Sequence, residues 1–313
     1  MARYGIIDLG SNTIRLCIYE VESTPRKPLQ KKDISTLLNY KIMAGLASHI
    51  KDGAMTKQGI QRAIKTINAH LRRASHFSCE RIDIFATAVL RNCTNSREAT
   101  AAIEAGTKTR IAILSNEEEA HLGFLGACID RYMEAGTMVD IGGGSTELTH
   151  INGGLDLDKI SIPQGSLSSF STYVKELLPT SKEREAIAKN FRSLATKHDA
   201  DIFTASQLFG IGGSIRSAAK IYGDLCNDGE RFEYLTPEHL DAILALYEKD
   251  PGLFVHEALR TVPDRIHTFI PGCIIIREVF SLYKAQRLDI LKFGVREGYL
   301  AERVLVKPVS ASS

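Results

Sequence analysis

Hydrophobic and polar positions follow two different periods along this chain, one typical of strands and one of helices. Residues 4–9 form a short apolar run and residues 14–21 alternate apolar and polar side chains, so together they predict a β-hairpin. Residues 35–42, 82–86 and 110–114 are also strand-like. Apolar residues with helical spacing begin near Thr56 and return over residues 96–105. Strands that alternate with helices predict an α/β fold.

The second half of the chain continues this alternation. Thr236 followed by Pro237 predicts a helix start, because threonine caps a helix N-terminus and proline suits its first turn. Pro271 and Gly272 are expected to open an apolar helix that ends near Tyr283. The other predicted elements are strands at 155–162, 202–211 and 288–293, and helices at 166–175, 181–197, 215–222 and 295–306.

One segment of the first half recurs in the second half. Residues 6–16, IIDLGSNTIRL, align without gaps on residues 138–148, MVDIGGGSTEL. In each copy an aspartate ends a strand, and a glycine-containing turn leads into the next strand, which predicts a hairpin. Two such hairpins predict two similar lobes whose turns face a common cleft, with a chance match as the alternative.

Composition narrows the class of protein. With 313 residues, 44% of them hydrophobic and 24% charged, the chain is long enough for about two domains. Its 39 Lys and Arg residues against 37 Asp and Glu are too even a balance to imply nucleic-acid binding. Six cysteines without a C-x-x-C pair are typical of buried thiols in a reducing compartment. No secretion signal or membrane span is recognised, so a cytoplasmic protein is expected.

Three glycine-rich turns are candidates for binding phosphate, because backbone N–H groups without bulky side chains can approach anionic oxygens. Ordinary turn chemistry is the alternative for each turn taken alone. No P-loop or Rossmann glycine motif is present, which excludes those nucleotide-binding signatures. The candidates are Ser11 and Asn12 in the first turn, Gly143, Gly144 and Ser145 in the second, and Gly213 and Ser214 in the third.

Acidic residues near the first two turns are candidates for a magnesium site. Asp8, Asp140 and Glu147 supply the oxygen ligands that Mg²⁺ prefers. The alternative for Asp8 is hydrogen bonding within its own turn, and for Glu147 a solvent-facing position on a strand.

Three consecutive glutamates, residues 117–119, stand at the start of a predicted helix. In the structural interpretation, Asn116 caps the helix and Glu119 completes a capping box three residues later. In the functional interpretation, one glutamate orients or deprotonates a water molecule. Arg91 is either a clamp for phosphate, through its planar guanidinium, or a surface residue.

Together these motifs resemble the exopolyphosphatase and guanosine pentaphosphate phosphohydrolase family. The resemblance covers nearly the whole chain, and its most specific part is the DIGGGSTE block followed by GIGGS. It implies an actin-like α/β fold with two RNase-H-like lobes, at 1–125 and 126–295, and a C-terminal helix at about 296–313 that packs on the first lobe. The blocks that carry it are DLGSNT at 8–13, ATAVLR at 86–91, NEEEA at 116–120, DIGGGSTE at 140–147, GIGGS at 210–214 and VREG at 295–298.

The resemblance also implies a metal-dependent phosphoric anhydride hydrolase that removes a terminal phosphate. Glu118 corresponds to the catalytic base, and Asp140 and Glu147, beside Asp8, to ligands of Mg²⁺ or Mn²⁺. Arg91 and the three glycine turns correspond to phosphate contacts.

The function expected first is hydrolysis of inorganic polyphosphate. The nearest alternative is a guanosine pentaphosphate phosphohydrolase of the stringent response. A silent binder of alarmone or polyphosphate and an actin-like kinase are the remaining alternatives. The expected partner is polyphosphate or guanosine penta- or tetraphosphate, with no nucleic acid and no membrane, and a homodimer is left open.

Overall fold

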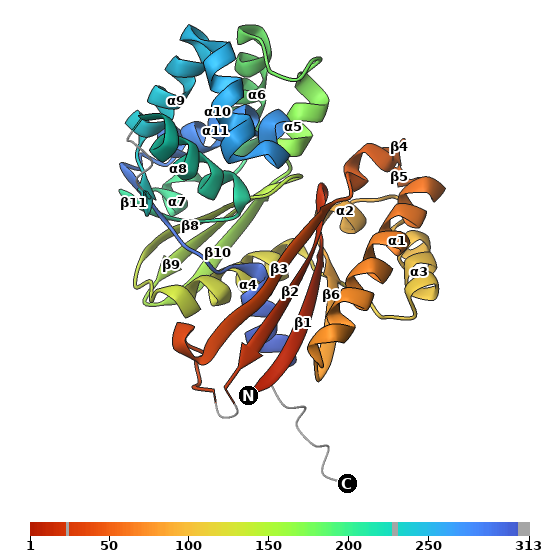
Figure 1. Ribbon diagram of the computed structural model, residues 1–313. Coiled ribbons are helices and arrows are strands. Elements are labelled where there is room, and N and C mark those ends of the chain that lie inside the picture. The colour runs from red at the N-terminus through yellow and green to blue at the C-terminus, as the bar shows by residue number, and fades with distance from the viewer. Residues whose placement is uncertain (23–24, 227–230, 306–313) are drawn as a thin grey trace. The chain divides into compact units, whose positions relative to one another are not determined.

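The computed structural model describes residues 1–22, 25–226 and 231–305, which form two compact units (Figure 1). Unit 1 comprises Met1–Tyr132 and the chain from Phe293 onward, and unit 2 comprises Met133–Lys292. Residues 306–313, which belong to the expected C-terminal helix, lie outside the described residues.

Unit 1 is built on a five-stranded mixed sheet in the order β3-β2-β1-β6-β7. Strands β1, β2 and β3 pair antiparallel, whereas β6 runs parallel to β1 and β7 parallel to β6. The predicted N-terminal hairpin is therefore confirmed. The elements are β1 (Ala2–Leu9), β2 (Thr13–Val21), β3 (Ile34–Met43), β4 (Ile50–Lys51), β5 (Ala54–Met55), α1 (Lys57–Ala74), β6 (Arg81–Ala86), α2 (Ala88–Arg91), α3 (Ser96–Thr107), β7 (Ala112–Ile113), α4 (Asn116–Asp130) and α12 (Val295–Tyr299), which continues as a π-helix (Leu300–Val304).

Helices cover both faces of this sheet, because successive strand residues point to opposite sides. Ile7 and Leu9 join a core formed with α1 and α3, whereas Ile6 joins a second core formed with α4 and α12. The predicted helix start near Thr56 is confirmed, since the Thr56 side chain caps α1 by accepting from the Gly59 N–H. Unit 1 is thus a three-layer α/β structure.

Unit 2 has a six-stranded mixed sheet in the order β10-β9-β8-β11-β13-β12. Strands β8, β9 and β10 pair antiparallel, β11 and β13 extend the sheet in parallel with β8, and β12 pairs antiparallel with β13. The elements are β8 (Gly136–Ile141), β9 (Thr146–Asn152), β10 (Leu155–Ile162), α5 (Ser166–Tyr173), α6 (Ser181–Ala195), α7 (Ala200–Phe203), β11 (Gln207–Ile211), α8 (Gly213–Cys226), β12 (Tyr234–Leu235), α9 (Pro237–Lys249), α10 (Pro251–Thr261), α11 (Ile266–Leu282) and β13 (Arg287–Ile290).

The sequence repeat is also a structural repeat. Hairpin β1–β2 holds the same place in the first sheet as β8–β9 in the second, and in both sheets two parallel strands follow on the far side of the hairpin. Three antiparallel strands extended by two parallel ones are the RNase-H-like arrangement. Its duplication confirms the actin-like α/β fold.

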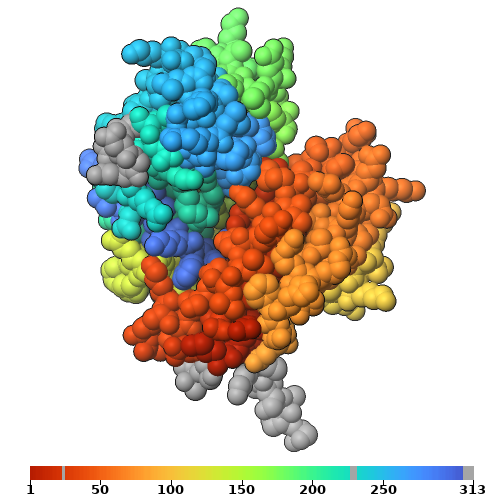
Figure 2. All heavy atoms as spheres, viewed as in Figure 1, coloured from red at the N-terminus to blue at the C-terminus, as the bar shows by residue number. Residues whose placement is uncertain are grey.

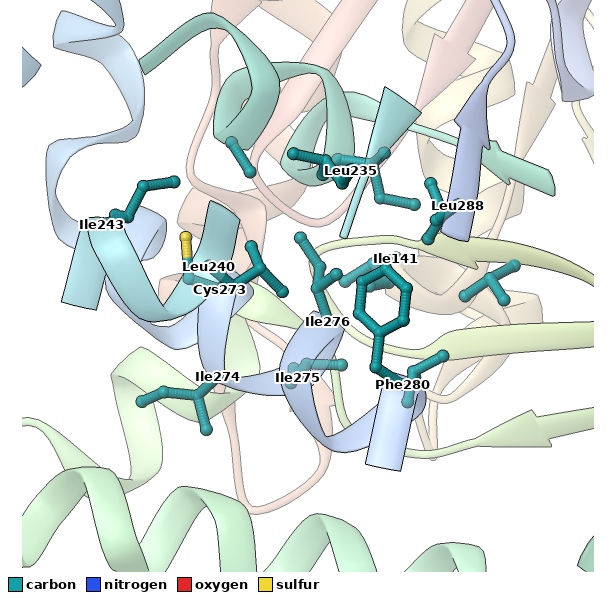
Figure 3. Close-up of a cluster of buried hydrophobic side chains, with 14 of the residues drawn as sticks. Ile141, Leu235, Leu240, Ile243, Cys273, Ile274, Ile275, Ile276, Phe280 and Leu288 are labelled. Atoms are coloured by element: carbon teal, nitrogen blue, oxygen red, sulfur yellow. The ribbon is translucent and has the colours of Figure 1, made fainter. Parts of the chain in front are cut away.

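The core of unit 2 is organised around α11 (Figure 3). Ile274, Ile275 and Ile276 are consecutive and all buried, so this helix is covered on most sides. The prediction that Pro271 opens the helix is wrong, because α11 begins at Ile266 and contains the proline. Burial of the first two turns in the core outweighs the backbone hydrogen bond that proline cannot make. Among the described residues, no helix combines the length and apolar character needed to cross a bilayer.

The predicted strand at 202–211 is wrong in its first part. Asp199 accepts from the Asp201 N–H at 3.1 Å and caps the short helix α7, and the strand begins only at Gln207. A local cap therefore overrides the strand-like composition of this segment.

Candidate functional site

The predicted site residues of unit 1 gather where its parallel strands end. The Thr87 N–H, just after β6, donates to the Leu9 carbonyl at the end of β1 (3.3 Å). The Leu114 N–H, just after β7, donates to the Ala86 carbonyl at the end of β6 (2.9 Å). Ligands of open α/β sheets bind at this carboxyl edge of the parallel strands.

The first glycine turn presents backbone donors at this edge. It is closed by a hydrogen bond from the Gly10 N–H to the Thr13 carbonyl at 3.0 Å. The carbonyls of Ser11 and Asn12 accept from backbone N–H groups of the segment that follows β3. The N–H groups of Ser11 and Asn12 bond to no acceptor within residues 1–22, 25–226 and 231–305. These are the donors that an oxyanion requires.

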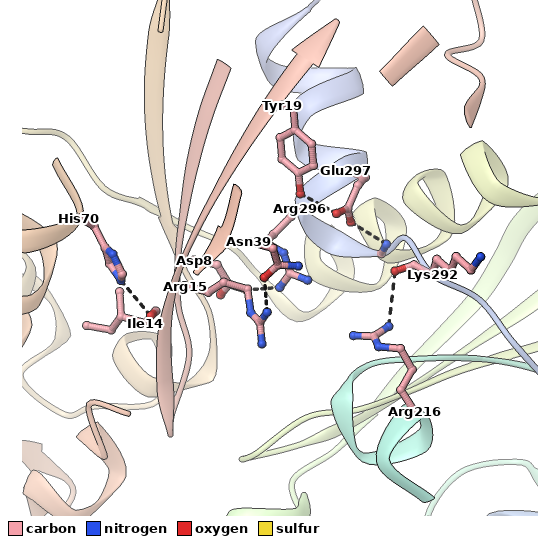
Figure 4. A network of polar contacts seen from close by, with 11 residues as sticks. Asp8, Ile14, Arg15, Tyr19, Asn39, His70, Arg216, Lys292, Arg296 and Glu297 are labelled. Atoms are coloured by element: carbon pink, nitrogen blue, oxygen red, sulfur yellow. Dashed lines mark hydrogen bonds and ion pairs between the residues drawn. The ribbon is translucent and has the colours of Figure 1, made fainter. Parts of the chain in front are cut away.

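Asp8 lies among arginines (Figure 4). Its cross-strand partner is Arg15, and Arg296 Nη1 donates to its Oδ2 at 2.9 Å. Burial and the neighbouring Arg296 lower the pKa of Arg15. Although burial acts to lower the pKa of Arg296, nearby acidic groups, Glu297 and Asp8 among them, raise it above its usual value. A carboxylate paired with a guanidinium is a poorer magnesium ligand, so these contacts count against Asp8 in that role.

The VREG block places Arg296 through its neighbour Glu297. The Tyr19 hydroxyl donates to Glu297 Oε1 at 2.5 Å, and the Gly294 N–H donates to Oε2 at 2.9 Å. Burial, and then the charge of Glu297, raise the pKa of Tyr19. The role of Arg296 at Asp8 had no signal in the sequence beyond the family resemblance, because the two residues are 288 positions apart.

The start of α4 differs by one residue from the prediction, and this shift changes which glutamate belongs to the helix cap. The N-cap is Ser115 rather than Asn116, and the capping box is completed by Glu118 rather than Glu119. Glu118 Oε2 accepts from the Ser115 N–H at 2.9 Å, and Oε1 pairs with Arg303 at 3.1 Å. Both oxygens of Glu118 therefore hold structure, and its side chain is 41% exposed. Its place in the capping box and its exposure count against Glu118 as the catalytic base.

Glu119 has a different environment. Its Oε2 lies 2.8 Å from Arg91 Nη1, and the two side chains are only 12% and 15% exposed. The same Arg91 nitrogen donates to the Leu114 carbonyl at 2.9 Å, whereas Nε has no acceptor among the described residues. The structure thus brings Arg91, the predicted phosphate clamp, to Glu119, the glutamate that the capping interpretation had assigned to the helix cap.

The second glycine turn repeats the first within unit 2. The Gly142 N–H donates to the Ser145 carbonyl at 3.0 Å, the distance also found in the first turn. Helix α5 supplies the N–H groups that bond to the Gly142 and Gly143 carbonyls. A Cβ atom at Gly165 would lie 2.6 Å from the Gly142 carbonyl oxygen, so this approach requires glycine. In the described part of the chain, the N–H groups of Gly143 and Gly144 have no acceptor.

The third turn lies beside Asp140, because β8 and β11 are parallel neighbours. Gly212 has a φ of +92°, and a Cβ atom there would stand 2.4 Å from Asp140 Oδ1. The Ser214 hydroxyl donates to the Ile141 carbonyl at 3.1 Å, which ties the start of α8 to the end of β8. The predicted residues Gly213 and Ser214 are therefore adjacent to Asp140.

Arg265 also belongs to this region, although it is not among the candidates named from the sequence. A Cβ atom at Gly213 would lie 2.0 Å from Arg265 Nη2, so the guanidinium is packed over the third turn. Arg265 ends a short 3₁₀ segment just before α11. Only the tertiary fold carries it to the turn, and no local motif marks it.

Asp140 and Glu147 fit the metal that the resemblance implies. They are directly opposite each other on β8 and β9, where the first hairpin has Asp8 opposite Arg15. Glu147 is 3% exposed, and its Oε1 accepts from the Ser161 hydroxyl at 2.9 Å. Opposed carboxylates repel, and a divalent cation relieves the repulsion. Mg²⁺ is commonly held by one or two carboxylates together with substrate phosphates. No cluster of three His, Cys, Asp or Glu ligands occurs among the described residues.

A comparison with protein families matches residues 34–307 to the model described as the Ppx/GppA phosphatase family. Among curated proteins, the chain is 28% identical over 294 residues to a bifunctional 3-dehydroquinate synthase/phosphatase of Fusobacterium nucleatum. That match covers 88% of this chain but only 43% of the relative, so the chain spans less than half of that protein. Exopolyphosphatase 1 of Mycobacterium tuberculosis is 24% identical, over 96% of this chain and 88% of its own length.

Solved structures support the fold. An exopolyphosphatase from Cytophaga hutchinsonii superimposes with a TM-score of 0.80 at 20% identity, covering 95% of this chain and 96% of that one. The Aquifex aeolicus Ppx/GppA family member gives a TM-score of 0.76 at 22% identity, covering 97% and 98% of the two chains. At these identities the likeness establishes the architecture alone.

Proposed function

Because the chain belongs to the Ppx/GppA phosphatase family, a family of hydrolases, we propose that it is an exopolyphosphatase. The substrate is a linear inorganic polyphosphate, and the reaction removes its terminal phosphate. The observation that carries this proposal is the largely buried pair of Glu119 and Arg91 at the carboxyl edge of the unit 1 sheet. It offers a carboxylate for water and a guanidinium for phosphate at one place.

The proposed reaction is direct attack by water on the terminal phosphorus. The water oxygen bonds to phosphorus as the bridging P–O bond breaks, so the products are orthophosphate and a chain shorter by one unit. Glu119 orients the water and accepts its proton. Arg91 and the backbone N–H groups of the first glycine turn bind the phosphoryl oxygens. Positioning and electrostatic stabilisation provide most of the catalysis in such transfers.

Asp140 and Glu147 are the residues proposed to hold Mg²⁺ or Mn²⁺. The metal, when bound, supplies positive charge that neutralises the substrate phosphates. Asp8 serves instead to hold Arg296 in place. Of the three acids named from the sequence as metal ligands, Asp140 and Glu147 keep that role, and Asp8 is instead paired with Arg296.

The test is orthophosphate release from polyphosphate and from guanosine pentaphosphate, each with and without Mg²⁺. The proposal expects Mg²⁺-dependent turnover of polyphosphate without any acceptor. Turnover of guanosine pentaphosphate alone would reassign the substrate, and release only in the presence of an acceptor would indicate a kinase. Tight binding with no turnover would indicate a silent binder.

Two variants distinguish the candidate bases. Glu119→Gln is expected to reduce turnover by about 10²- to 10⁴-fold, the usual contribution of a general base. Glu118→Gln keeps a side-chain carbonyl oxygen that can accept from the Ser115 N–H in the capping box, and it is expected to reduce turnover by less than about tenfold. The opposite ranking would return the catalytic role to Glu118.

A further inference from the structure

A basic groove of about 560 Å³ lies on unit 1, and none of its lining residues is a candidate site residue named above. The exposed side of the N-terminal half of α1 forms one wall, and Ala44 and His49 lie across from it. The orange atoms in Figure 2 belong to the part of unit 1 that includes α1. The whole groove belongs to unit 1, so its place relative to the first glycine turn is fixed.

The lining of the groove is cationic. Lys57, Arg62 and Lys65 contribute positive charge, two glutamines contribute neutral polar groups, and the described lining residues include no carboxylate. Lys57 and Lys65 are exposed and take part in no ion pair with a described residue. They stand eight positions apart on one helix face, about 12 Å along the axis at 1.5 Å per residue. Arg62 is anchored by its hydrogen bond to the Met43 carbonyl at 3.1 Å.

The groove is connected to the first glycine turn by backbone hydrogen bonds. The Ala44 N–H donates to the Asn12 carbonyl at 2.9 Å, and the next N–H, of Gly45, donates to the same oxygen at 2.8 Å. The Ala47 N–H donates to the Ser11 carbonyl at 2.9 Å. The wall formed by Ala44 is therefore hydrogen-bonded to the same turn whose Ser11 and Asn12 N–H groups have no acceptor among the described residues.

We propose that this groove binds the internal phosphates of a linear polyphosphate whose terminal phosphate lies at the first glycine turn. The inference rests on the proposed function and specifies its substrate. A linear polyphosphate carries negative charge on every unit, so each phosphate that enters the groove is attracted by the lysine side chains. A nucleoside offers a neutral base and ribose there, and no Phe, Tyr or Trp among the described lining residues is available to stack on a base.

The experiment compares a long polyphosphate with tripolyphosphate as substrates of the double variant Lys57→Met and Lys65→Met. For the long chain, KM is expected to rise by about tenfold with kcat unchanged, because each exposed charge contact contributes modestly. For tripolyphosphate, which ends near the turn, KM is expected to change by less than about twofold. The KM for the long chain should also depend less steeply on salt than in the wild type.

Arg72→Met is the matched control. Arg72 is an exposed cation on the same helix, 15 positions beyond Lys57 and about 22 Å along the axis, and it does not line the groove. It should leave both KM values unchanged. Circular dichroism of all variants should match the wild type, since these side chains are exposed.

Equal KM changes for long and short substrates, or no change for either, would overturn the proposal that the groove binds internal phosphates. Failure of the proposed function is a separate result, because it would appear as no turnover of any polyphosphate by the wild type. In that case the groove is tested by the affinity for long polyphosphate in EDTA. Equal binding by the wild type and the double variant would then overturn it.

Discussion

Replacing Arg296 with methionine tests whether the ion pair with Asp8 organises the unit 1 site. Methionine keeps an apolar stem of similar length but leaves the Asp8 carboxylate without its guanidinium. Breaking a fully buried pair costs about 3–5 kcal/mol. The Asp8 and Arg296 side chains are 20% and 17% exposed, and Arg15 remains as the cross-strand neighbour of Asp8. We therefore expect a smaller loss of unfolding free energy, about 2 kcal/mol.

The assay is urea unfolding of a double-mutant cycle formed by Arg296→Met, Asp8→Asn and their combination. Contacting charged residues give coupling energies of about 0.5–3 kcal/mol, and this pair should give about 1–2 kcal/mol. The control is Arg277→Met, which removes the partner of Asp241 in an exposed pair between α11 and α9. That change should cost less than about 0.5 kcal/mol.

The same variants report on the proposed function. Without Arg296, the carboxyl edge of β1 loses the guanidinium that Asp8 holds there, so phosphate release should fall even where the protein remains folded. A coupling energy below about 0.3 kcal/mol would refute the energetic argument. Full activity of a folded Arg296→Met variant would refute the argument that the pair positions site groups.

Three further outcomes are expected. Gly126→Ala should destabilise the protein by about 2 kcal/mol or more in urea unfolding, because its Cβ atom would lie 1.9 Å from the Gly294 carbonyl oxygen; normal stability would mean that α4 and α12 can separate. Burial lowers the pKa of His70, whose Nε2 contacts the Ile14 carbonyl and whose Nδ1 has no partner among the described residues. The unfolded chain thus takes up the proton first, and stability should fall as pH drops below about 6.5, less steeply in His70→Gln; equal slopes would contradict this. Asp140→Asn should raise the Mg²⁺ concentration for half-maximal phosphate release by about tenfold or more, and an unchanged Mg²⁺ curve would remove Asp140 from the metal site.

The sequence by itself determined the local structure and the repeat. The two hairpins, the start of α1 near Thr56 and the start of α9 after Thr236 all form where the sequence predicts them. These signals succeed because each depends on residues within a few positions of one another. The glycine turns belong to the same class, since a turn is specified by its own residues.

At the start of α4, the local sequence allows two capping boxes, and only the tertiary structure decides between them. Ser115 with Glu118 and Asn116 with Glu119 both satisfy the spacing of a capping box, and a shift of one residue rotates every side chain by about 100°. Contacts with distant segments select the first reading: Arg303 pairs with Glu118, and Arg91 pairs with Glu119.

The same reason explains why Arg296, Arg265 and the basic groove could not be located from the sequence. Each depends on which segments the fold brings together, such as β1 with α12 or the third turn with the segment before α11. The sequence specifies which side-chain groups are present. The distance between two charged groups is set by the packing of cores that contain residues from the whole unit. The sequence therefore named the chemical groups, and the fold decided which of them act together.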